Sequence, residues 1–150
     1  MSKRFFAAAG LGILIIVQPA ISDSLMPVAL RCEYRVNPSG VDEAQPRLTW
    51  RVESPSRGAQ QSAYRVLVAS STALLDRGAG DLWDSGQVSG SETVNVVYGG
   101  KALNSRQPCF WKVCVWDTAG KARWSAPAAW SMGLLKPGDW KADYIAFRDT

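Results

Sequence analysis

Carboxylates are the side chains of this sequence that come nearest to a catalytic set. Asp42 and Glu43 are adjacent, and Asp81 and Asp84 lie on either side of Trp83. Two carboxylates can act as general acid and base, and with a backbone carbonyl they can bind Ca²⁺. Asp42 and Glu43 lie in a loop, and Asp81 and Asp84 lie at a sheet edge. Because exposed Asp is common in turns, we interpret both pairs as solvated turn and cap residues. No spacing approaches that of an EF-hand loop.

Histidine is absent from all 150 residues. This excludes Ser-His-Asp and Cys-His triads, histidine-ligated zinc or haem, and the usual proton shuttle at neutral pH. A glycine-rich phosphate loop is also missing. The sequence therefore predicts no catalytic residues, no metal site and no cofactor.

The charge and the apolar content indicate one globular domain behind a targeting segment. The net charge is +4, 47% of residues are apolar and seven are Trp. Lys3 and Arg4 precede an apolar run over 5–17, and Ala20 and Ser22 occupy the small-residue positions of a signal-peptidase site. The run is shorter than the about 20 residues that span a bilayer. Residues 1–22 thus read as a signal peptide. Its loss lowers the net charge to +2 and removes the argument for nucleic-acid binding.

Export predicts a periplasmic or secreted protein and an oxidising compartment for the three cysteines. Because three is odd, at least one cysteine stays free or pairs between chains. Cys109 and Cys114 are five residues apart in a predicted strand, so they point to opposite faces and a bridge between them is not expected. With Cys32, they are best interpreted as small buried hydrophobic residues.

Apolar residues alternate with polar ones in short runs that end at turn residues, as in antiparallel sandwiches. The clearest alternation places Leu48, Trp50 and Val52 on one face. The longest run is expected to be a central strand. Predicted strands cover residues 28–34, 47–53, 64–68, 81–86, 93–98, 109–116 and 123–132, with one helical turn at 73–75. The fold class is therefore all-β, a seven-stranded immunoglobulin or fibronectin type III-like sandwich over residues 23–135.

One loop departs from the type III pattern. Those modules place a Tyr six residues after a loop Leu, and the Tyr hydroxyl ties the loop back. Here the residue six positions after Leu103 is Cys109. We expect the loop 99–108 to be held by packing of Leu103 and by the rigidity of Pro108.

Aromatic residues mark a candidate surface on the sixth predicted strand. Its outward face carries Phe110, Lys112, Cys114 and Trp116, and the seventh strand adds Trp124 and Trp130 nearby. Such aromatic groups stack on sugar rings or bury themselves against another domain. We favour domain docking, because half of these aromatics must fill the core. The candidate surface, for docking or sugar stacking, consists of Phe110, Lys112, Trp116 and Trp124.

An ordered set of short motifs resembles the N-terminal module of bacterial α-L-rhamnosidases of glycoside hydrolase family 78. The likeness extends over about residues 27–147, with departures at Ala122 and Tyr144. The motifs are Leu30-Arg31-Cys32-Glu33-Tyr34, Pro46-Arg47-Leu48-Thr49-Trp50-Arg51, Tyr64-Arg65-Val66-Leu67-Val68, Asp81-Leu82-Trp83-Asp84-Ser85-Gly86, Trp111-Lys112-Val113, Val115-Trp116-Asp117, Trp124-Ser125 and Asp139-Trp140-Lys141-Ala142.

The resemblance implies an exported protein that acts on rhamnose-containing glycans. In that family a separate helical domain performs inverting hydrolysis with two Glu residues, and none of them has a counterpart here. Residues 136–150 then read as a linker and the start of a following domain, because Trp140, Tyr144, Ile145 and Phe147 are apolar.

We therefore expect a fragment: the non-catalytic first module of an exported α-L-rhamnosidase, docked against downstream domains of the same polypeptide. A free-standing secreted carbohydrate-binding or adhesion module is the alternative. The expected partners are those domains and a rhamnose-containing glycan, with no nucleic acid, and with the membrane contacted only through the signal segment during export.

Overall fold

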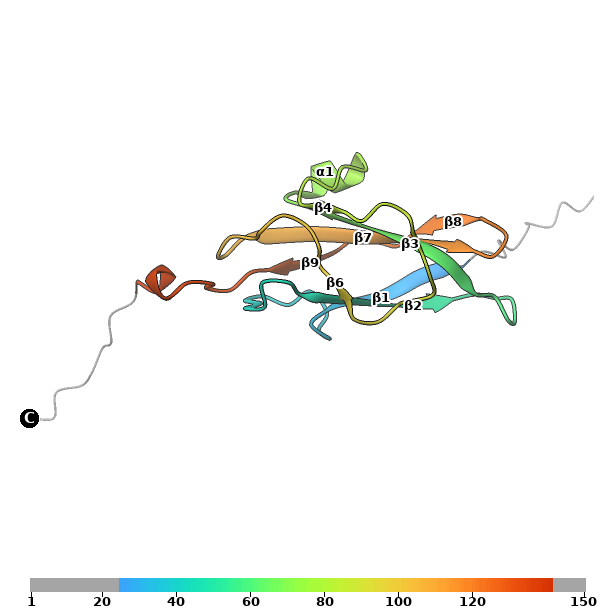
Figure 1. Ribbon diagram of the computed structural model, residues 1–150, viewed down its shortest axis with the longest axis horizontal. Coiled ribbons are helices and arrows are strands. Elements are labelled where there is room, and N and C mark those ends of the chain that lie inside the picture. The colour runs from blue at the N-terminus through green and yellow to red at the C-terminus, as the bar shows by residue number, and fades with distance from the viewer. Residues whose placement is uncertain (1–24, 142–150) are drawn as a thin grey trace, which may run out of the picture.

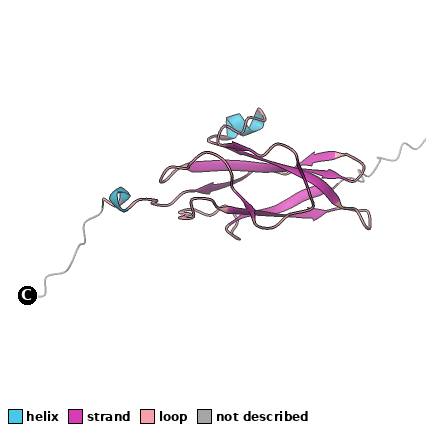
Figure 2. Ribbon diagram, in the orientation of Figure 1, coloured by secondary structure: helices cyan, strands magenta, loops and turns pink. Residues whose placement is uncertain are grey.

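The computed structural model describes residues 25–141, which form two facing antiparallel sheets (Figure 1). The smaller sheet has the order β1 (Met26–Cys32), β2 (Arg47–Glu53), β6 (Val96–Val97). The larger sheet has the order β4 (Trp83–Asp84), β3 (Gln61–Ala69), β7 (Pro108–Asp117), β8 (Ala122–Trp124), while β5 (Val88–Ser89) also pairs with β3 and β9 (Ala128–Ser131) with β7. Two short helices, α1 (Thr72–Asp76) and the 3₁₀ helix η1 (Pro137–Asp139), complete this part of the chain (Figure 2). The predicted fold class is confirmed.

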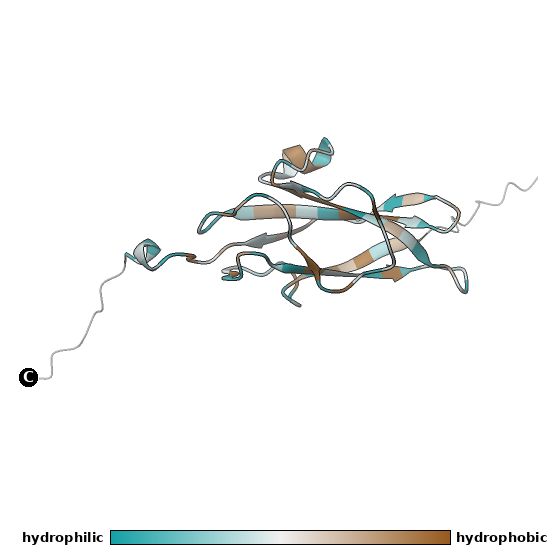
Figure 3. Ribbon diagram, in the orientation of Figure 1, coloured by the Kyte–Doolittle hydropathy of each residue, from teal (hydrophilic) through white to brown (hydrophobic). Residues whose placement is uncertain are grey.

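The core lies between the sheets and follows the predicted alternation. In β7 the inward side chains are fully buried, as are Val66 and Val68 of β3. Leu48 and Trp50 of β2 face them from the smaller sheet and are 0% and 1% exposed. Figure 3 shows hydrophobic residues within the strands and on α1, and mainly hydrophilic residues in the turns. Burial of this apolar surface is the main force that holds the two layers together.

An aromatic chain runs through the core near β9. Trp83 and Tyr98 have ring centroids 5.4 Å apart, Tyr98 and Trp130 are 6.2 Å apart, and Trp130 and Trp111 are 6.5 Å apart, all in edge-to-face geometry. Trp130 is 2% exposed. The expectation that Trp130 lies near the outward surface is therefore wrong, because its ring fills the core.

The first predicted strand ends earlier than its alternation suggests. The register of β1 on β2 shifts between Val28 and Arg31, where Ala29 has a φ of 52°. Cys32 is the last residue of the strand. Tyr34 then has a φ of 64° and is half exposed, so it does not continue the buried face.

The last predicted strand is divided into β8 and β9. Ser125 lies between them and satisfies both backbone groups of Val113 in β7. Its N–H donates to the carbonyl of Val113 at 2.8 Å, and its side-chain hydroxyl accepts from the N–H of Val113 at 3.1 Å. Pro127 follows and has no N–H to donate, which suits a break in the ladder. The predicted strand 93–98 is shorter in the structure, where only Val96 and Val97 form β6.

The loop between β6 and β7 is anchored by a tyrosine that the sequence analysis missed. The Tyr98 hydroxyl lies 2.8 Å from the carbonyl oxygen of Lys101 and 3.2 Å from that of Leu82, so it can donate to either. A Cβ at Gly100 would lie 2.5 Å from this hydroxyl, and only glycine leaves the space. Leu103 is buried, as predicted. Tyr98, the first residue after β6, thus supplies the hydroxyl that is missing at Cys109.

Several sequence predictions fall outside residues 25–141, among them the signal peptide over 1–22 and the apolar residues Tyr144, Ile145 and Phe147. Trp140 is described and is 62% exposed. In the part of the chain that the structure covers, no helix has the length and apolar character needed to cross a membrane.

Candidate functional site

The outward face of the larger sheet carries the predicted candidate residues. Cys114 of β7 pairs with Trp124 of β8, so Trp124 lies beside the row that contains Lys112 and Trp116. The Lys112 ammonium nitrogen lies 4.9 Å from the ring centroid of Trp124, a cation–π geometry. The indole of Trp124 is 38% exposed, and Lys112 and Trp116 are partly buried. The structure thus brings Lys112 and Trp124 into contact, and Trp116 lies on the same face of the sheet, opposite Ala122.

Phe110 belongs to a different environment on the same face. It packs against a small buried cluster that consists of Leu67, Ala69, Leu74 and Leu75. Helix α1 covers this cluster, and it begins where the Ser71 hydroxyl accepts a hydrogen bond from the N–H of Leu74 at 3.3 Å. Phe110 therefore supports α1, and the accessible part of the candidate surface is formed by the other three residues. A docking or sugar-stacking role for the set stays a prediction.

An ion pair borders the surface on the β3 side. Arg65 pairs in register with Cys114, and its guanidinium donates to both carboxylate oxygens of Asp84 at 2.9 and 2.6 Å. This hydrogen bonding lowers the pKa of Asp84. Asp81 accepts hydrogen bonds from the N–H and the hydroxyl of Ser70 at 2.8 and 2.7 Å. Both carboxylates therefore hold neighbouring segments together, and Asp84, which lies in β4, does so from a strand and not from the solvated turn that the sequence predicted.

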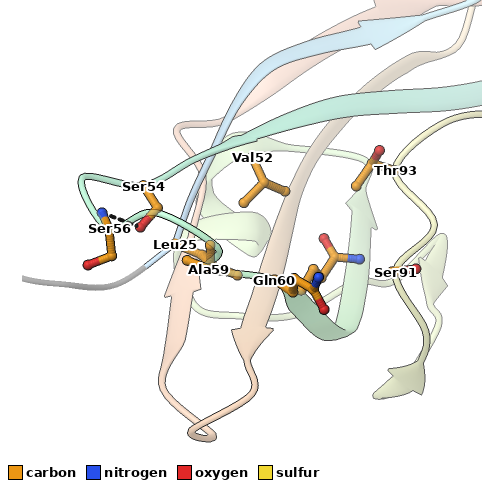
Figure 4. A pocket seen from close by; sticks show the side chains of 9 residues that line it. Leu25, Val52, Ser54, Ser56, Ala59, Gln60, Ser91 and Thr93 are labelled. Carbon is orange, nitrogen blue, oxygen red and sulfur yellow. Dashed lines mark hydrogen bonds between the residues drawn. The ribbon is translucent and has the colours of Figure 1, made fainter.

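A hollow lies at the end of the sandwich where β1 begins (Figure 4). Its volume is about 540 Å³. The lining residues are uncharged: Leu25, Val52, Ser54, Ser56, Ala59, Gln60, Gln61, Ser91 and Thr93. The N–H of Ser56 donates to the hydroxyl of Ser54 at 3.1 Å. The residues that line this hollow present hydroxyl and amide groups but no titratable side chain. None of them can therefore act as a general acid or base at neutral pH.

Sequence reasoning missed this hollow because its residues come from four separate segments, at 25, 52–56, 59–61 and 91–93. No local pattern connects them. The nearest signal was the turn composition around residues 54–58, which indicates only that a loop closes there.

The three cysteines are buried free thiols. Burial raises the pKa of Cys32 and of Cys109 to about 12, and that of Cys114 to about 11. Because the thiolate is the nucleophilic form, these side chains are inert at neutral pH. Their interpretation as small buried hydrophobic residues is confirmed.

Comparison with known families decides what the sandwich is. A family model described as "Rha78A-like, N-terminal immunoglobulin domain" matches residues 27–136. The chain belongs to this family. Family membership agrees with the two-sheet architecture, and it explains why the motifs of the sequence occur in that order.

Relatives of this Rha78A-like domain are much longer proteins. An α-L-rhamnosidase of Streptomyces avermitilis is 46% identical over 115 residues, which cover 76% of this chain and 11% of the relative. The structure described as that organism's α-L-rhamnosidase complexed with L-rhamnose matches with a TM-score of 0.75 and 44% identity, over 79% of this chain and 12% of that one. The α-L-rhamnosidase structure from Dictyoglumus thermophilum matches with a TM-score of 0.78 and 35% identity, over 83% and 14%. This chain thus spans about an eighth of these relatives.

Proposed function

We propose that the Rha78A-like sandwich acts as the non-catalytic N-terminal module of an exported α-L-rhamnosidase. The observation that supports this most strongly is the match of residues 27–136 to a domain that stands at the N-terminus of relatives about eight times longer. Inverting hydrolysis needs two carboxyl groups roughly 6.5–9.5 Å apart in a sugar-binding cleft. In the described residues, Asp81 and Asp84 are bound to Ser70 and Arg65 instead.

Within that enzyme the module would dock against downstream domains of the same polypeptide. Trp124 and Trp116 offer apolar area, and Lys112 adds a charge beside the ring of Trp124. Partly exposed aromatic side chains of this kind are enriched in protein interfaces. The rhamnose-containing glycan would be bound and cleaved by the other domains, and the module would orient them.

A fusion experiment tests the proposal. Residues 25–141 would replace the matching segment of the S. avermitilis α-L-rhamnosidase, with the same enzyme lacking the segment as the control. We expect the fusion to hydrolyse an aryl α-L-rhamnoside and to melt at a higher temperature than the control. The separate chain should hydrolyse nothing. Hydrolysis by the separate chain, or equal activity and stability of fusion and control, would contradict the proposal.

Export is a further part of the proposal and has its own test. If residues 1–22 are removed during passage through the membrane, the first residue of the protein recovered from a bacterial periplasm or culture medium is Asp23. Amino-terminal sequencing reads this directly. Recovery of uncleaved chain from the cytoplasm alone would count against export.

The alternative function is a free-standing carbohydrate-binding module, and the partial exposure of Trp124 favours it. Lys112 lies over this ring, so one face of the indole already has a neighbour. Titration of the chain with L-rhamnose, followed by tryptophan fluorescence in the parent and in Trp124→Ala, distinguishes the two functions. Saturable binding that Trp124→Ala abolishes would favour sugar recognition over docking.

A further inference from the structure

The polypeptide that follows β9 is bound to the sandwich instead of leaving it directly. The N–H of Met132 donates to the carbonyl of Gln107 at 2.9 Å, and the N–H of Arg106 donates to the carbonyl of Gly133 at 3.0 Å. On the other side, the N–H of Gly133 donates to the carbonyl of Val41 at 2.7 Å. The chain is therefore held between two loops as it passes out of the sheet.

Ser105 continues this attachment beyond the last strand. Its hydroxyl accepts a hydrogen bond from the N–H of Leu135 at 2.9 Å and donates to the carboxylate of Asp139. The same carboxylate oxygen accepts from the N–H of Lys136 at 3.1 Å, and Arg106 donates to the carbonyl of Asp139 at 3.3 Å. One serine hydroxyl thus joins the start and the end of the segment 135–139.

The local sequence suits this arrangement. Pro137 stands at the start of η1, where its fixed φ favours a helical turn and its missing N–H costs nothing. Leu135 packs against the core cluster, so an apolar contact accompanies the polar ones. The Ser105 hydrogen bond lowers the pKa of Asp139, as expected for a carboxylate that accepts it.

The segment 135–139 lies where the polypeptide leaves the sandwich. In Figure 1, η1 lies at the end of the sandwich opposite to the start of β1. The polypeptide that continues past residue 141 therefore leaves from this end of the sandwich.

We propose that Ser105 and Asp139 form a clamp that fixes the direction in which the polypeptide leaves the sandwich toward the next domain of the same polypeptide. This inference rests on the proposed function, and it concerns the connection between the module and the domain that follows it. Hydrogen bonds from several consecutive residues restrict the backbone of 133–139, so the connection behaves as a rigid coupling and not as a free linker.

Backbone dynamics of the full chain test the clamp. Amide hydrogen exchange and ¹⁵N relaxation would be measured for the parent, Ser105→Ala and Ser105→Thr, which keeps the hydroxyl. Ser70→Ala is the matched control, because Ser70 also donates to a carboxylate, that of Asp81, at 2.7 Å. We expect Ser105→Ala to speed exchange at Leu135 and Lys136 by about tenfold and to leave β7 unchanged. Ser105→Thr should restore protection, and Ser70→Ala should leave residues 133–139 unaffected.

Two results would overturn the clamp: fast exchange at residues 133–139 in the parent, or equal protection in Ser105→Ala and the parent. The fusion with the S. avermitilis enzyme separates this failure from that of the proposed function. Should the fusion be active and stable while Ser105→Ala changes neither its melting temperature nor the exchange at 135–139, the clamp alone is wrong. If the fusion itself gains nothing over the enzyme without the module, the proposed function fails whatever the clamp does.

Discussion

The indole N–H of Trp50 donates to the side-chain oxygen of Gln61 at 3.1 Å, across the space between the two sheets. The amide nitrogen of Gln61 donates to the carbonyls of Gly90 and Glu92 at 3.2 and 3.0 Å. Gln61 is 8% exposed, yet its acceptor and both donors are used. A single amide therefore connects β2, β3 and the loop before β6 at one end of the sandwich.

Replacement of this amide should destabilise the fold. Gln61→Ala leaves the buried N–H of Trp50 without an acceptor, so we expect the free energy of unfolding to fall by about 2–3 kcal/mol. Urea denaturation measures the change. The neighbouring Gln60 is exposed, and Gln60→Ala should change the free energy by less than about 0.5 kcal/mol. Equal effects of the two variants would contradict the role given to Gln61.

Alanine substitutions of the two tryptophans in the last predicted strand should destabilise the fold to very different extents. Trp130 fills the core, so Trp130→Ala should cost about 3–5 kcal/mol of unfolding free energy. Trp124 contributes a partly exposed ring and a contact to Lys112, so Trp124→Ala should cost about 1 kcal/mol. Thermal and urea denaturation of both variants check this. A large loss for Trp124→Ala would show that its ring supports the sheet more than it serves the surface.

Trp124 and Trp130 also show what could not be predicted from the sequence. They are six positions apart, and in one continuous strand an even spacing places both on the same face. The break at 125–127 reverses this, because β8 and β9 pair separately with β7: Trp124 opposite Cys114, and Trp130 opposite Cys109. Pro127 indicated an edge or a bulge, but the change of face depends on backbone bonds between distant residues.

Alternation predicted the faces of β2, β3 and β7 well, because a period of two is local to each strand. It also placed Lys112 and Trp116 outward. It could not foresee that α1 covers Phe110, since that contact joins segments more than thirty residues apart. Nor could it find the Ser105–Asp139 contact, which forms only when the loop 103–107 and the segment after β9 meet at one end of the fold.

The buried thiols predict a loss of stability at alkaline pH. Burial raises the pKa of Cys109 from 9.0 to about 12 in the folded chain, so only the unfolded chain ionises readily. The corresponding stability is fully present below pH 9 and is lost as the pH rises from 9 toward 12. Urea denaturation at pH 8 and pH 10 should show a smaller loss for Cys109→Ala than for the parent.

Thiol labelling gives an independent measurement of the same feature. At pH 8 an aromatic disulfide reagent should label the native chain only as fast as it unfolds, and all three thiols should react at once in denaturant. Rapid labelling of the native chain that Cys109→Ala reduces would show that Cys109 is accessible. An identical pH dependence of stability in Cys109→Ala and the parent would show that Cys109 does not contribute to the alkaline loss.

The hydroxyl of Tyr98 is expected to stabilise the loop that leads to β7. Tyr98→Phe keeps the ring between Trp83 and Trp130 but removes the donor to the carbonyls of Lys101 and Leu82, so unfolding should become easier by about 1 kcal/mol. Amide exchange at Lys101 should accelerate with it, because this N–H donates to the Leu82 carbonyl in the same loop.

Tyr34→Phe is the matched control for this variant. The Tyr34 hydroxyl donates to the side chain of Asn95 at 2.7 Å, but the pair is exposed to water, which can replace the bond. We therefore expect a change below about 0.5 kcal/mol and no effect on the Lys101 amide. If Tyr98→Phe and Tyr34→Phe were equally mild, the loop would be held by the packing of Leu103 and the rigidity of Pro108 alone, as the sequence predicted.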